Sequence, residues 1–400
     1  MSVKFLEGVK VLELATFIAA PASTRVMADW GAEVIKIETE FGDPIRYVGP
    51  DKKMPLDQNE SLAYDYENAN KKGVVINLKS ENGLKAFHKL IEECDIFVTN
   101  LRTQALEKLG IDYETLSKKK PELVFGQILG YGRKGPLKDK PGYDFTAFAA
   151  RGGWSGTLYE KGTSPINCLP GMGDHQAGMY LATGLLAAYI HAKKTGKGDK
   201  VTVSLYHAAV YGLATMIHSA QYGNQYPISR EDMLNPLQTT YITKDEVWIQ
   251  LAIPEYNKYI AKFLKVIGQP ELAGDERFDT LAHVANNPQA LNQIISETIK
   301  EKTLEEWTKI FEEADFCFEI CQTWDQILAD EQAWESDIFA KLDYPSGPKA
   351  MARTPVMFDE AGLPDYEKGP ALGEDTQEVL LSVGFTLDEI KAMKEKGEVK

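Results

Sequence analysis

Short hydrophobic runs alternate with amphipathic stretches along the first third of the chain. Between the runs, segments such as ENGLKAFHKLIEE and TQALEKLG carry apolar residues at helical spacing. Strands separated by helices predict parallel βαβ units, with helices on both faces of one sheet and ligands at the carboxyl ends of the strands. The runs predicted as strands are KVLELA, EVIKIE, GVVINL, DIFVTN and LVFGQILGYG.

After residue 150 the pattern lengthens into two largely apolar helices, predicted over 175–194 and 205–222. Beyond them a strand-like run, VWIQLAI, precedes amphipathic helices, one of which begins with a capping box formed by Thr303 and Glu306. This change predicts a smaller second domain. The predicted boundaries are 1–223 for the first part of a large domain, 224–330 for a small domain and 331–400 for a return to the large domain.

Composition and net charge argue against nucleic acid and membranes as binding partners of this protein. The 400 residues are 44% hydrophobic and 26% charged, as in globular proteins, and no stretch has the length of a membrane span or the pattern of a signal segment. The net charge of −15 argues against nucleic acid, whose binding needs a broad basic face, but a few local lysines can still bind a small anion. We therefore expect a cytoplasmic protein without nucleic-acid or membrane partners.

The spacing of cysteines and histidines argues against disulfides and metal sites, and missing motifs argue against two common classes of nucleotide-binding enzyme. The four cysteines are too scattered for a disulfide framework and are expected to be reduced thiols. The six histidines lack the i, i+4 spacing of metal ligands, so no metal is expected. G-x-G-x-x-G does not follow the first predicted strand, and G-x-x-x-x-G-K-[ST] does not occur, which argues against a dinucleotide oxidoreductase and a P-loop NTPase.

Asp174 follows a glycine at the start of a predicted apolar helix, in LPGMGDHQAG. An Asp at the N-cap of a helix can have a purely structural role. The same backbone N–H groups and helix dipole are expected to hold the carboxylate ionised, and Gly173 permits close approach of a ligand, which suits a nucleophile. His175 is adjacent, but neighbours on a helix diverge by about a quarter turn, so adjacency makes no catalytic pair. The residues alone leave both roles of Asp174 open.

Cationic residues recur at or after the ends of predicted strands in the same half of the chain. The glycine-rich loop GYGRKGPLKDKPGYD carries an arginine and three lysines and could bind phosphates, although lysines in such loops more often face solvent. The first strand ends in TFIAAP, an apolar loop that packs either beside a substrate or in the core. Further cations that could converge on one polyphosphate are Lys71, Lys72, Lys79, Arg102 and Lys108.

Seven blocks of the chain carry a resemblance to a known family. They are GVKVLELATFIAAPASTRVMADWGAEVIKIETEFGDPIR, NANKKGVVINLK, TNLRTQALEKLG, GYGRKGPLKDKPGYD, PGMGDHQAG, KTGKGDKVTVSL and PALGEDT. In order and spacing they resemble the class III (formyl-CoA and carnitine type) CoA-transferase family from about Gly8 to Thr376. A narrower resemblance rests on ENANKK, ARGGWSGTLYEKGT and PGMGDHQAGM. It is to the (R)-2-hydroxyacyl transferases of amino-acid-fermenting anaerobes, which act on phenyllactate and 2-hydroxyisocaproate.

The resemblance implies a Rossmann-like large domain with a parallel sheet, a smaller α+β domain and an interlocked homodimer. It implies that Asp174 is the nucleophile and forms an aspartyl-CoA thioester, with Asp144 as a carboxyl neighbour that orients it. Coenzyme A is then a thioester substrate rather than a tightly bound cofactor. The positions implied for CoA are Lys79, Asn100, Arg102, Lys108 and Lys140, and those implied for the substrate pocket are Phe17, Ile18, Ala19 and Tyr143.

A few positions depart from relatives in the same superfamily. Thr39 stands where formyl-CoA transferases have an arginine, which removes one expected contact to the adenosine end of CoA. Ile18 stands where they have a glutamine and, with Phe17, indicates a pocket for a larger apolar acyl chain. The second domain also lacks the glycine-rich loop of the formyl type. Tyr143 replaces a histidine of the acyl-CoA racemases, which need a base on each side of the α-carbon.

The function implied is transfer of CoA from an acyl-CoA or 2-enoyl-CoA, such as isocaprenoyl-CoA, to a free (R)-2-hydroxycarboxylate in leucine fermentation. The preferred acid is 2-hydroxyisocaproate, and the product would feed a 2-hydroxyacyl-CoA dehydratase. The alternatives are a cinnamoyl-CoA:phenyllactate CoA-transferase, an acyl-CoA racemase of the same superfamily and, in another class, a non-catalytic CoA-binding protein. A non-catalytic protein would keep the lysines but would have no need of Asp174.

Overall fold

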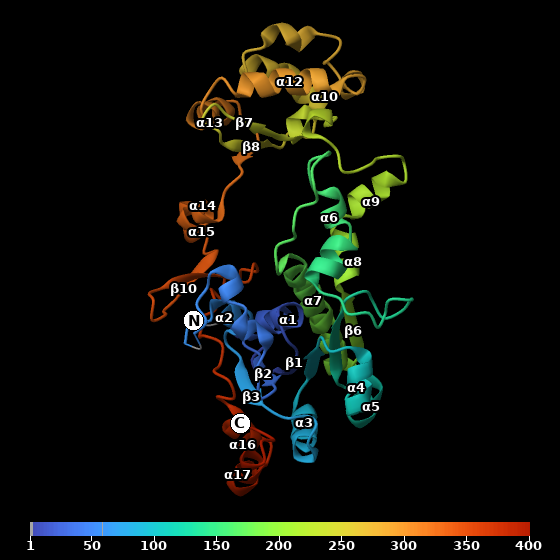
Figure 1. Ribbon diagram of the computed structural model, residues 1–400, viewed down its shortest axis with the longest axis vertical. Coiled ribbons are helices and arrows are strands. Elements are labelled where there is room, and N and C mark those ends of the chain that lie inside the picture. The colour runs from blue at the N-terminus through green and yellow to red at the C-terminus, as the bar shows by residue number, and fades with distance from the viewer. Residues whose placement is uncertain (1–2, 58) are drawn as a thin grey trace. The chain divides into compact units, whose positions relative to one another are not determined.

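The computed structural model describes residues 3–57 and 59–400, and the chain divides into two compact units (Figure 1). The first unit comprises Met1–Trp154, Asn167–His218 and Glu331–Lys400, and the second comprises Ser155–Ile166 and Ser219–Asp330. The pattern places residues 155–166 in the large domain, whereas the structure groups them with the second unit. Glu160 explains this, because its carboxylate accepts hydrogen bonds from Ser229 Oγ at 2.6 Å and from the backbone N–H of Arg230.

A six-stranded parallel sheet forms the centre of the first unit, which confirms the predicted α/β class. Its spatial order is β3-β2-β1-β4-β5-β6, with every neighbouring pair parallel. The pattern does not predict the last strand, whose sequence KVTVS follows a basic loop. The strands are β1 (Lys10–Leu14), β2 (Glu33–Glu38), β3 (Lys72–Val75), β4 (Ile96–Thr99), β5 (Val124–Leu129) and β6 (Lys200–Ser204).

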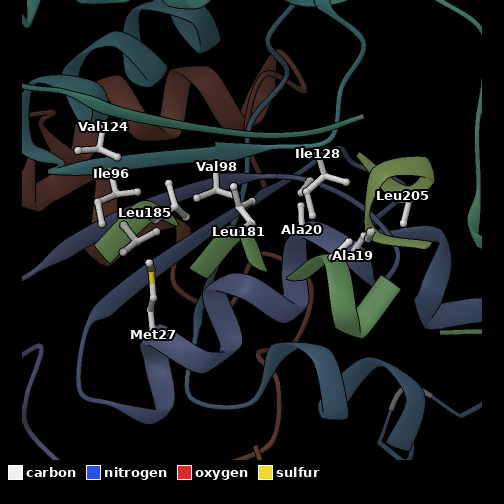
Figure 2. Close-up of a cluster of buried hydrophobic side chains, with 14 of the residues drawn as sticks. Ala19, Ala20, Met27, Ile96, Val98, Val124, Ile128, Leu181, Leu185 and Leu205 are labelled. Atoms are coloured by element: carbon white, nitrogen blue, oxygen red, sulfur yellow. The ribbon is translucent and has the colours of Figure 1, made fainter. Parts of the chain in front are cut away.

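Helices cover both faces of this sheet because its buried strands are apolar on both sides. On one face, α1 (Ala19–Asp29) and α7 (Met172–Thr195) pack on the strands, and in Figure 2 their side chains point toward those of β4 and β5. The other face packs against helices from three separate parts of the chain. These are α3 (Glu81–Glu93), α4 (Thr103–Leu109), α5 (Tyr113–Lys119), α16 (Thr376–Ser382) and α17 (Leu387–Glu395).

Two helix boundaries differ from the predicted ones. The helix predicted from residue 175 begins at Met172, and Gly171 precedes it with a φ of 88°, a left-handed conformation that suits glycine. The helix predicted over 205–222 is interrupted at Leu213, giving α8 (Leu205–Gly212) and α9 (Ala214–Ala220). Gly212 lies at the break, and glycine is among the weakest helix formers. The predicted capping box is present, with Thr303 and Glu306 exchanging hydrogen bonds.

The second unit packs helices on a small antiparallel sheet of order β7-β8-β9. Its core contains the stacked rings of Trp307 and Phe311 beside Phe263. Its strands and helices are β7 (Thr240–Ile242), β8 (Trp248–Leu251), β9 (Phe318–Ile320), α10 (Tyr256–Val266), α11 (Leu281–Val284), α12 (Pro288–Ile299), α13 (Leu304–Glu313) and α14 (Trp324–Ala329).

Shorter elements complete the chain. Among the described residues, none of the helices combines the length and the apolar character needed to cross a membrane. The remaining helices and strands are α2 (Leu62–Asn68), α6 (Trp154–Thr157), α15 (Glu331–Glu335), β10 (Phe339–Leu342) and β11 (Lys349–Ala352). The 3₁₀ helices are η1 (Pro44–Tyr47), η2 (Pro50–Lys52), η4 (Arg230–Asp232), η5 (Pro236–Gln238) and η6 (Pro270–Gly274), and η3 (Asp144–Ala150) is a π-helix.

Candidate active site

The loop between β1 and α1 is held in an unusual backbone conformation. Phe17 has a backbone φ of 62°, a value that residues other than glycine seldom adopt. Asn100, just after β4, fixes the preceding residue, because its side chain accepts a hydrogen bond from Thr16 N at 3.1 Å and donates one to Thr16 O at 2.7 Å. Asp43 accepts a hydrogen bond from Phe17 N at 3.0 Å. Three separate segments therefore place the Phe17 ring.

A fully buried ion cluster lies beneath this loop. Lys36 Nζ is 2.7 Å from Glu13 Oε1 and 2.9 Å from Asp43 Oδ2, and Lys71 Nζ is 2.8 Å from Glu13 Oε2. The two lysines also donate hydrogen bonds to the carbonyl oxygens of Ala15 and Pro21, at 3.0 and 2.9 Å. Because a buried charge needs partners of opposite sign, this cluster ties both ends of the loop to the sheet.

Burial and charge set the ionisation of this cluster. Burial opposes ionisation of Glu13, but the charges of Lys36 and Lys71 outweigh it and lower the pKa of Glu13 to about 2. Burial lowers the pKa of Lys71 to about 8 despite the nearby carboxylate. The expectation that Lys71 helps to bind a polyphosphate is therefore wrong. Lys71 is enclosed by protein, and Lys72 pairs with Glu33 and Glu378.

Asp174 is the third residue of α7, and Gly171 rather than Asp174 occupies the N-cap. The expectation that the helix terminus holds this carboxylate ionised is also wrong. Burial, reinforced by the charge of Asp144, raises the pKa of Asp174 to about 7. Dipole effects at helix termini are small compared with the cost of burying a carboxylate next to another one. Asp174 therefore changes charge near neutral pH.

Asp144 begins the π-helix η3 and is almost fully buried. Its Oδ1 accepts a hydrogen bond from Gly173 N at 3.0 Å, while its Oδ2 finds no hydrogen-bond partner among the described residues. Burial raises its pKa. A Cβ on Gly173 would lie 2.5 Å from Asp144 Oδ1 and 2.2 Å from Phe148 Cγ, so only glycine lets the start of α7 approach this carboxyl.

His175 forms an ion pair with a carboxylate distant in the sequence. Its Nε2 lies 2.8 Å from Glu67 Oε1, and the Glu67 side chain is only 3% exposed. The imidazole also packs edge-on against the Tyr66 ring, with centroids 5.3 Å apart. Burial opposes the charged form, but the hydrogen bond and charge of Glu67 outweigh it and raise the pKa of His175.

Two pockets of different character meet at Asp174. The first, which we call the cationic pocket, has a volume of about 270 Å³ and is lined by Arg102, Lys138 and Lys140 after the carboxyl ends of β4 and β5. The second, the apolar pocket, has a volume of about 330 Å³. The residues of its wall are Phe17, Ile18, Ile45, Val48, Lys52, Ala63, Tyr66, Glu67, Tyr143, Asp144, Phe145, Pro170, Gly171, Asp174 and His175.

Two aromatic rings stand where these pockets adjoin. Phe17 and Tyr143 line both pockets and meet edge to face, with centroids 6.0 Å apart. A third pocket, of about 560 Å³, shares Thr16 and Leu101 with the cationic pocket and includes Thr39. A ligand with a long anionic part and an apolar end could therefore place its central atoms beside Asp174.

The predicted site residues divide among these pockets. Phe17, Ile18, Tyr143 and Asp174 line both the cationic and the apolar pocket. Ala19, Asn100, Arg102 and Lys140 line the cationic pocket, Asp144 lines the apolar pocket, and Lys79 lines the third. In the described part of the chain, Lys108 on α4 lines none of the three.

The sequence did not single out some residues that the structure brings to these pockets. Lys138 lies in the predicted cationic loop but was one of several lysines without a distinguishing mark. Glu67 is the first residue of the block ENANKK and Tyr66 precedes it, but no local spacing connects either residue with His175. Within residues 3–57 and 59–400, no group of three or more His, Cys, Asp or Glu side chains could hold a metal ion.

Comparison with known proteins points to one family. Residues 6–376 match the profile described as CoA-transferase family III. The chain is 52% identical over 397 residues to the cinnamoyl-CoA:phenyllactate CoA-transferase of Clostridium sporogenes, covering 98% of this chain and 96% of that protein. It is 51% identical over 391 residues to the (R)-2-hydroxy-4-methylpentanoate CoA-transferase of Clostridioides difficile, covering 98% of each. The crystal structure of a CaiB/BaiF family protein from Brucella suis superposes with a TM-score of 0.80 at 26% identity, covering 95% of this chain and 100% of that one.

Proposed function

The chain belongs to CoA-transferase family III, and from that premise we propose that it moves CoA from an acyl-CoA or 2-enoyl-CoA to a free (R)-2-hydroxycarboxylate by way of Asp174. The observation that carries the proposal is the position of this carboxyl, which lines both the cationic and the apolar pocket. The cationic pocket suits the phosphates of CoA. The apolar pocket suits the side chain of the acid.

The residues at this junction support a sequence of acyl transfers. A carboxylate oxygen of Asp174 attacks the thioester carbonyl of the donor, and the CoA thiolate leaves, which gives a mixed anhydride. The thiolate then attacks the aspartyl carbonyl carbon and releases the donor acid, leaving CoA on Asp174 as a thioester. The carboxylate of the 2-hydroxy acid attacks that thioester and frees the thiolate again. Attack of the thiolate on the hydroxyacyl carbonyl restores the Asp174 carboxylate.

Each intermediate retains the energy of the thioester only if water is kept away. Phe17 and Tyr143, which line both pockets and touch edge to face, are placed to cover the reacting carbonyl. Asp144 is placed to orient the start of α7 through its hydrogen bond from Gly173. We therefore assign nucleophilic attack to Asp174 and positioning to Asp144.

The aliphatic part of the apolar pocket's wall supports a branched aliphatic acid. Ile18, Ile45, Val48 and Ala63 form this part, and the rings of Phe17, Tyr66, Tyr143 and Phe145 line the rest of the pocket. The two clostridial relatives act on an aromatic and a branched aliphatic acid. We propose 2-hydroxy-4-methylpentanoate, also called 2-hydroxyisocaproate, with isocaprenoyl-CoA as donor. Phenyllactate with cinnamoyl-CoA is the alternative.

This choice of substrate suggests a metabolic setting. A 2-hydroxyacyl-CoA is the form that a dehydratase can convert to the 2-enoyl-CoA donor, so transfer and dehydration would form a cycle. We propose that this cycle belongs to leucine fermentation in the cytoplasm of an anaerobe, as the clostridial origin of the two relatives supports.

We also propose a homodimer, and the surface of the first unit supports it. The 24-residue helix α7 is apolar around much of its circumference, and Ile190 on it is 54% exposed. Tyr211 on α8 and Ile217 on α9 are exposed as well. Apolar helix surfaces of this kind are usually covered by another chain. The interlocked arrangement implied by the family resemblance would cover them with a second copy.

The proposal is tested by incubating the protein with isocaprenoyl-CoA in heavy water and measuring two masses. We expect a CoA-sized adduct on the peptide that contains Asp174, and we expect it to disappear when 2-hydroxy-4-methylpentanoate is added. Deuterium at the α-carbon of the recovered thioester without any adduct would instead identify a racemase. Binding with neither result would identify a CoA-binding protein without this activity.

The cationic pocket yields a prediction about CoA affinity. Lys140→Ala should raise the KM for acyl-CoA by about 10- to 100-fold, because a hydrogen bond to a charged group contributes about 1.5–3 kcal/mol. Lys108→Ala, which removes the same charge from α4, should change it by no more than about twofold. Initial rates at varied acyl-CoA concentration measure both. Equal losses in the two variants would show that CoA follows a path outside the cationic pocket.

A further inference from the structure

The His175–Glu67 ion pair connects α7 with α2 beside the nucleophile. Both residues line the apolar pocket, and both also line a neighbouring pocket of about 450 Å³, so the pair forms the wall between the two. His175 follows Asp174 directly in α7. The pair spans 108 residues of sequence at an Nε2 to Oε1 distance of 2.8 Å. Because the pair lies beside Asp174, we expect it to affect the nucleophile as well as to link the two helices.

The charges around Asp174 need a balancing cation. The ionisable groups that line the apolar pocket with His175 are Lys52, Tyr66, Glu67, Tyr143, Asp144 and Asp174. The ionisable groups on the other side of His175, in the neighbouring pocket, are Arg25, Tyr180 and Arg353. Arg25 Nε already pairs with Asp29 Oδ1 at 2.8 Å. Three carboxyl groups thus share one pocket with few cations. An ionised Asp174 beside Asp144 is costly unless a positive charge stands close to it.

We propose that His175, held by Glu67, is a positioning residue whose positive charge keeps the adjacent Asp174 carboxylate available as the nucleophile. This inference rests on the proposed function and goes beyond it by naming what controls the nucleophile. The role differs from that of a general base, because His175 Nε2 is occupied by Glu67 and a backbone hydrogen bond at Gly171 engages the ring as well.

The ionisation of the two neighbours supports this role. Burial opposes the charged form of His175, but the hydrogen bond and charge of Glu67 outweigh it and raise its pKa, which favours the imidazolium. Burial and Asp144 raise the pKa of Asp174 to about 7, and His175 acts in the opposite direction. A protonated carboxyl group is a poor nucleophile. Removing the imidazolium charge should therefore leave less of Asp174 in its reactive form at any pH near neutral.

The test is the pH dependence of CoA-adduct formation on Asp174 in a single turnover with acyl-CoA, followed by rapid quench and intact mass. In the unmodified enzyme the rate should rise with pH around a midpoint near 7. In His175→Gln the midpoint of this pH profile should move up by about 1–2 pH units. The rate of adduct formation should fall by about tenfold or more at pH 6.5, and at high pH it should reach a plateau within a few-fold of the rate of the original enzyme. His175→Lys, which keeps the charge, should restore the midpoint.

Controls separate this role from a structural one. His283→Gln breaks another histidine–carboxylate pair, with Asp279 at 2.6 Å, whose residues line neither pocket that contains Asp174, and it should leave the midpoint unchanged. His175→Asn replaces the glutamine variant if that one does not fold. A loss of equal size at every pH, with an unmoved midpoint, would overturn the inference. No adduct in the unmodified enzyme at any pH would overturn the proposed function itself, and this inference with it.

Discussion

Asp174→Asn should abolish the CoA adduct and lower kcat for transfer by at least about 10³-fold, because the amide offers no carboxylate oxygen for attack on the thioester. The change is nearly isosteric, so both pockets and the α7 terminus should be preserved. Intact mass after incubation with acyl-CoA, together with steady-state rates, measures the two effects. An adduct on another residue at an undiminished rate would assign the nucleophile elsewhere.

The same variant should be more stable than the original at neutral and alkaline pH. The pKa of Asp174 is raised in the folded state from 3.8 to about 7, so the folded protein holds this proton more tightly than the unfolded chain. Stability therefore falls as pH rises from about 4 to 7, and Asn removes that loss. We expect a gain of about 1–3 kcal/mol in the free energy of unfolding at pH 8, after allowance for partial solvent exposure, and little gain below pH 4. Urea unfolding at the two pH values distinguishes this result from general destabilisation.

Glu13→Gln should lower the free energy of unfolding by about 3–5 kcal/mol, because it leaves two fully buried lysines without their shared carboxylate. The effect should reach the site as well. Lys36 and Lys71 hold the carbonyl oxygens of Ala15 and Pro21, so transfer activity should fall even where the variant remains folded. Urea unfolding monitored by circular dichroism measures the first effect, and rates at saturating substrate measure the second.

A matched control for this cluster lies on the surface. Glu93→Gln breaks the exposed pair with Lys10, at 3.4 Å, and should change the free energy of unfolding by less than about 1 kcal/mol. Losses of similar size in the two variants would show that burial does not set the strength of the internal pairs.

Much of the sheet could be predicted because its strands are short and apolar on both faces. Five of the strands coincide with runs such as KVLELA and DIFVTN, where hydrophobic content and length agree. The sixth, Lys200–Ser204, has the polar–apolar alternation of a half-buried strand, but it is short and directly follows a basic loop, so a search for continuous apolar runs missed it. The break at Leu213 also escaped prediction, since one glycine in an apolar stretch does not by itself end a helix.

The site was less predictable than the fold because its chemistry depends on distant parts of the chain. Asp174 was found through its sequence block, but its raised pKa follows first from burial in the folded protein and then from Asp144, which lies on another element. Lys71 and Lys140 both lie near the ends of predicted strands, yet Lys71 is enclosed in an ion cluster and Lys140 lines a pocket. Local pattern does not distinguish these outcomes, because a lysine is buried only when tertiary packing supplies its carboxylate.

The return of the chain to its first unit after residue 330 has a consequence for biosynthesis. Leu380 and Ile390 complete a core that otherwise consists of strands and helices from the first 125 residues, and Glu398 O accepts a hydrogen bond from Asn77 N at 2.8 Å. During translation, one face of the earlier strands therefore stays uncovered until residues 376–395 have left the ribosome. Over this interval the nascent protein would depend on chaperones, and premature termination upstream of α16 would produce fragments that aggregate.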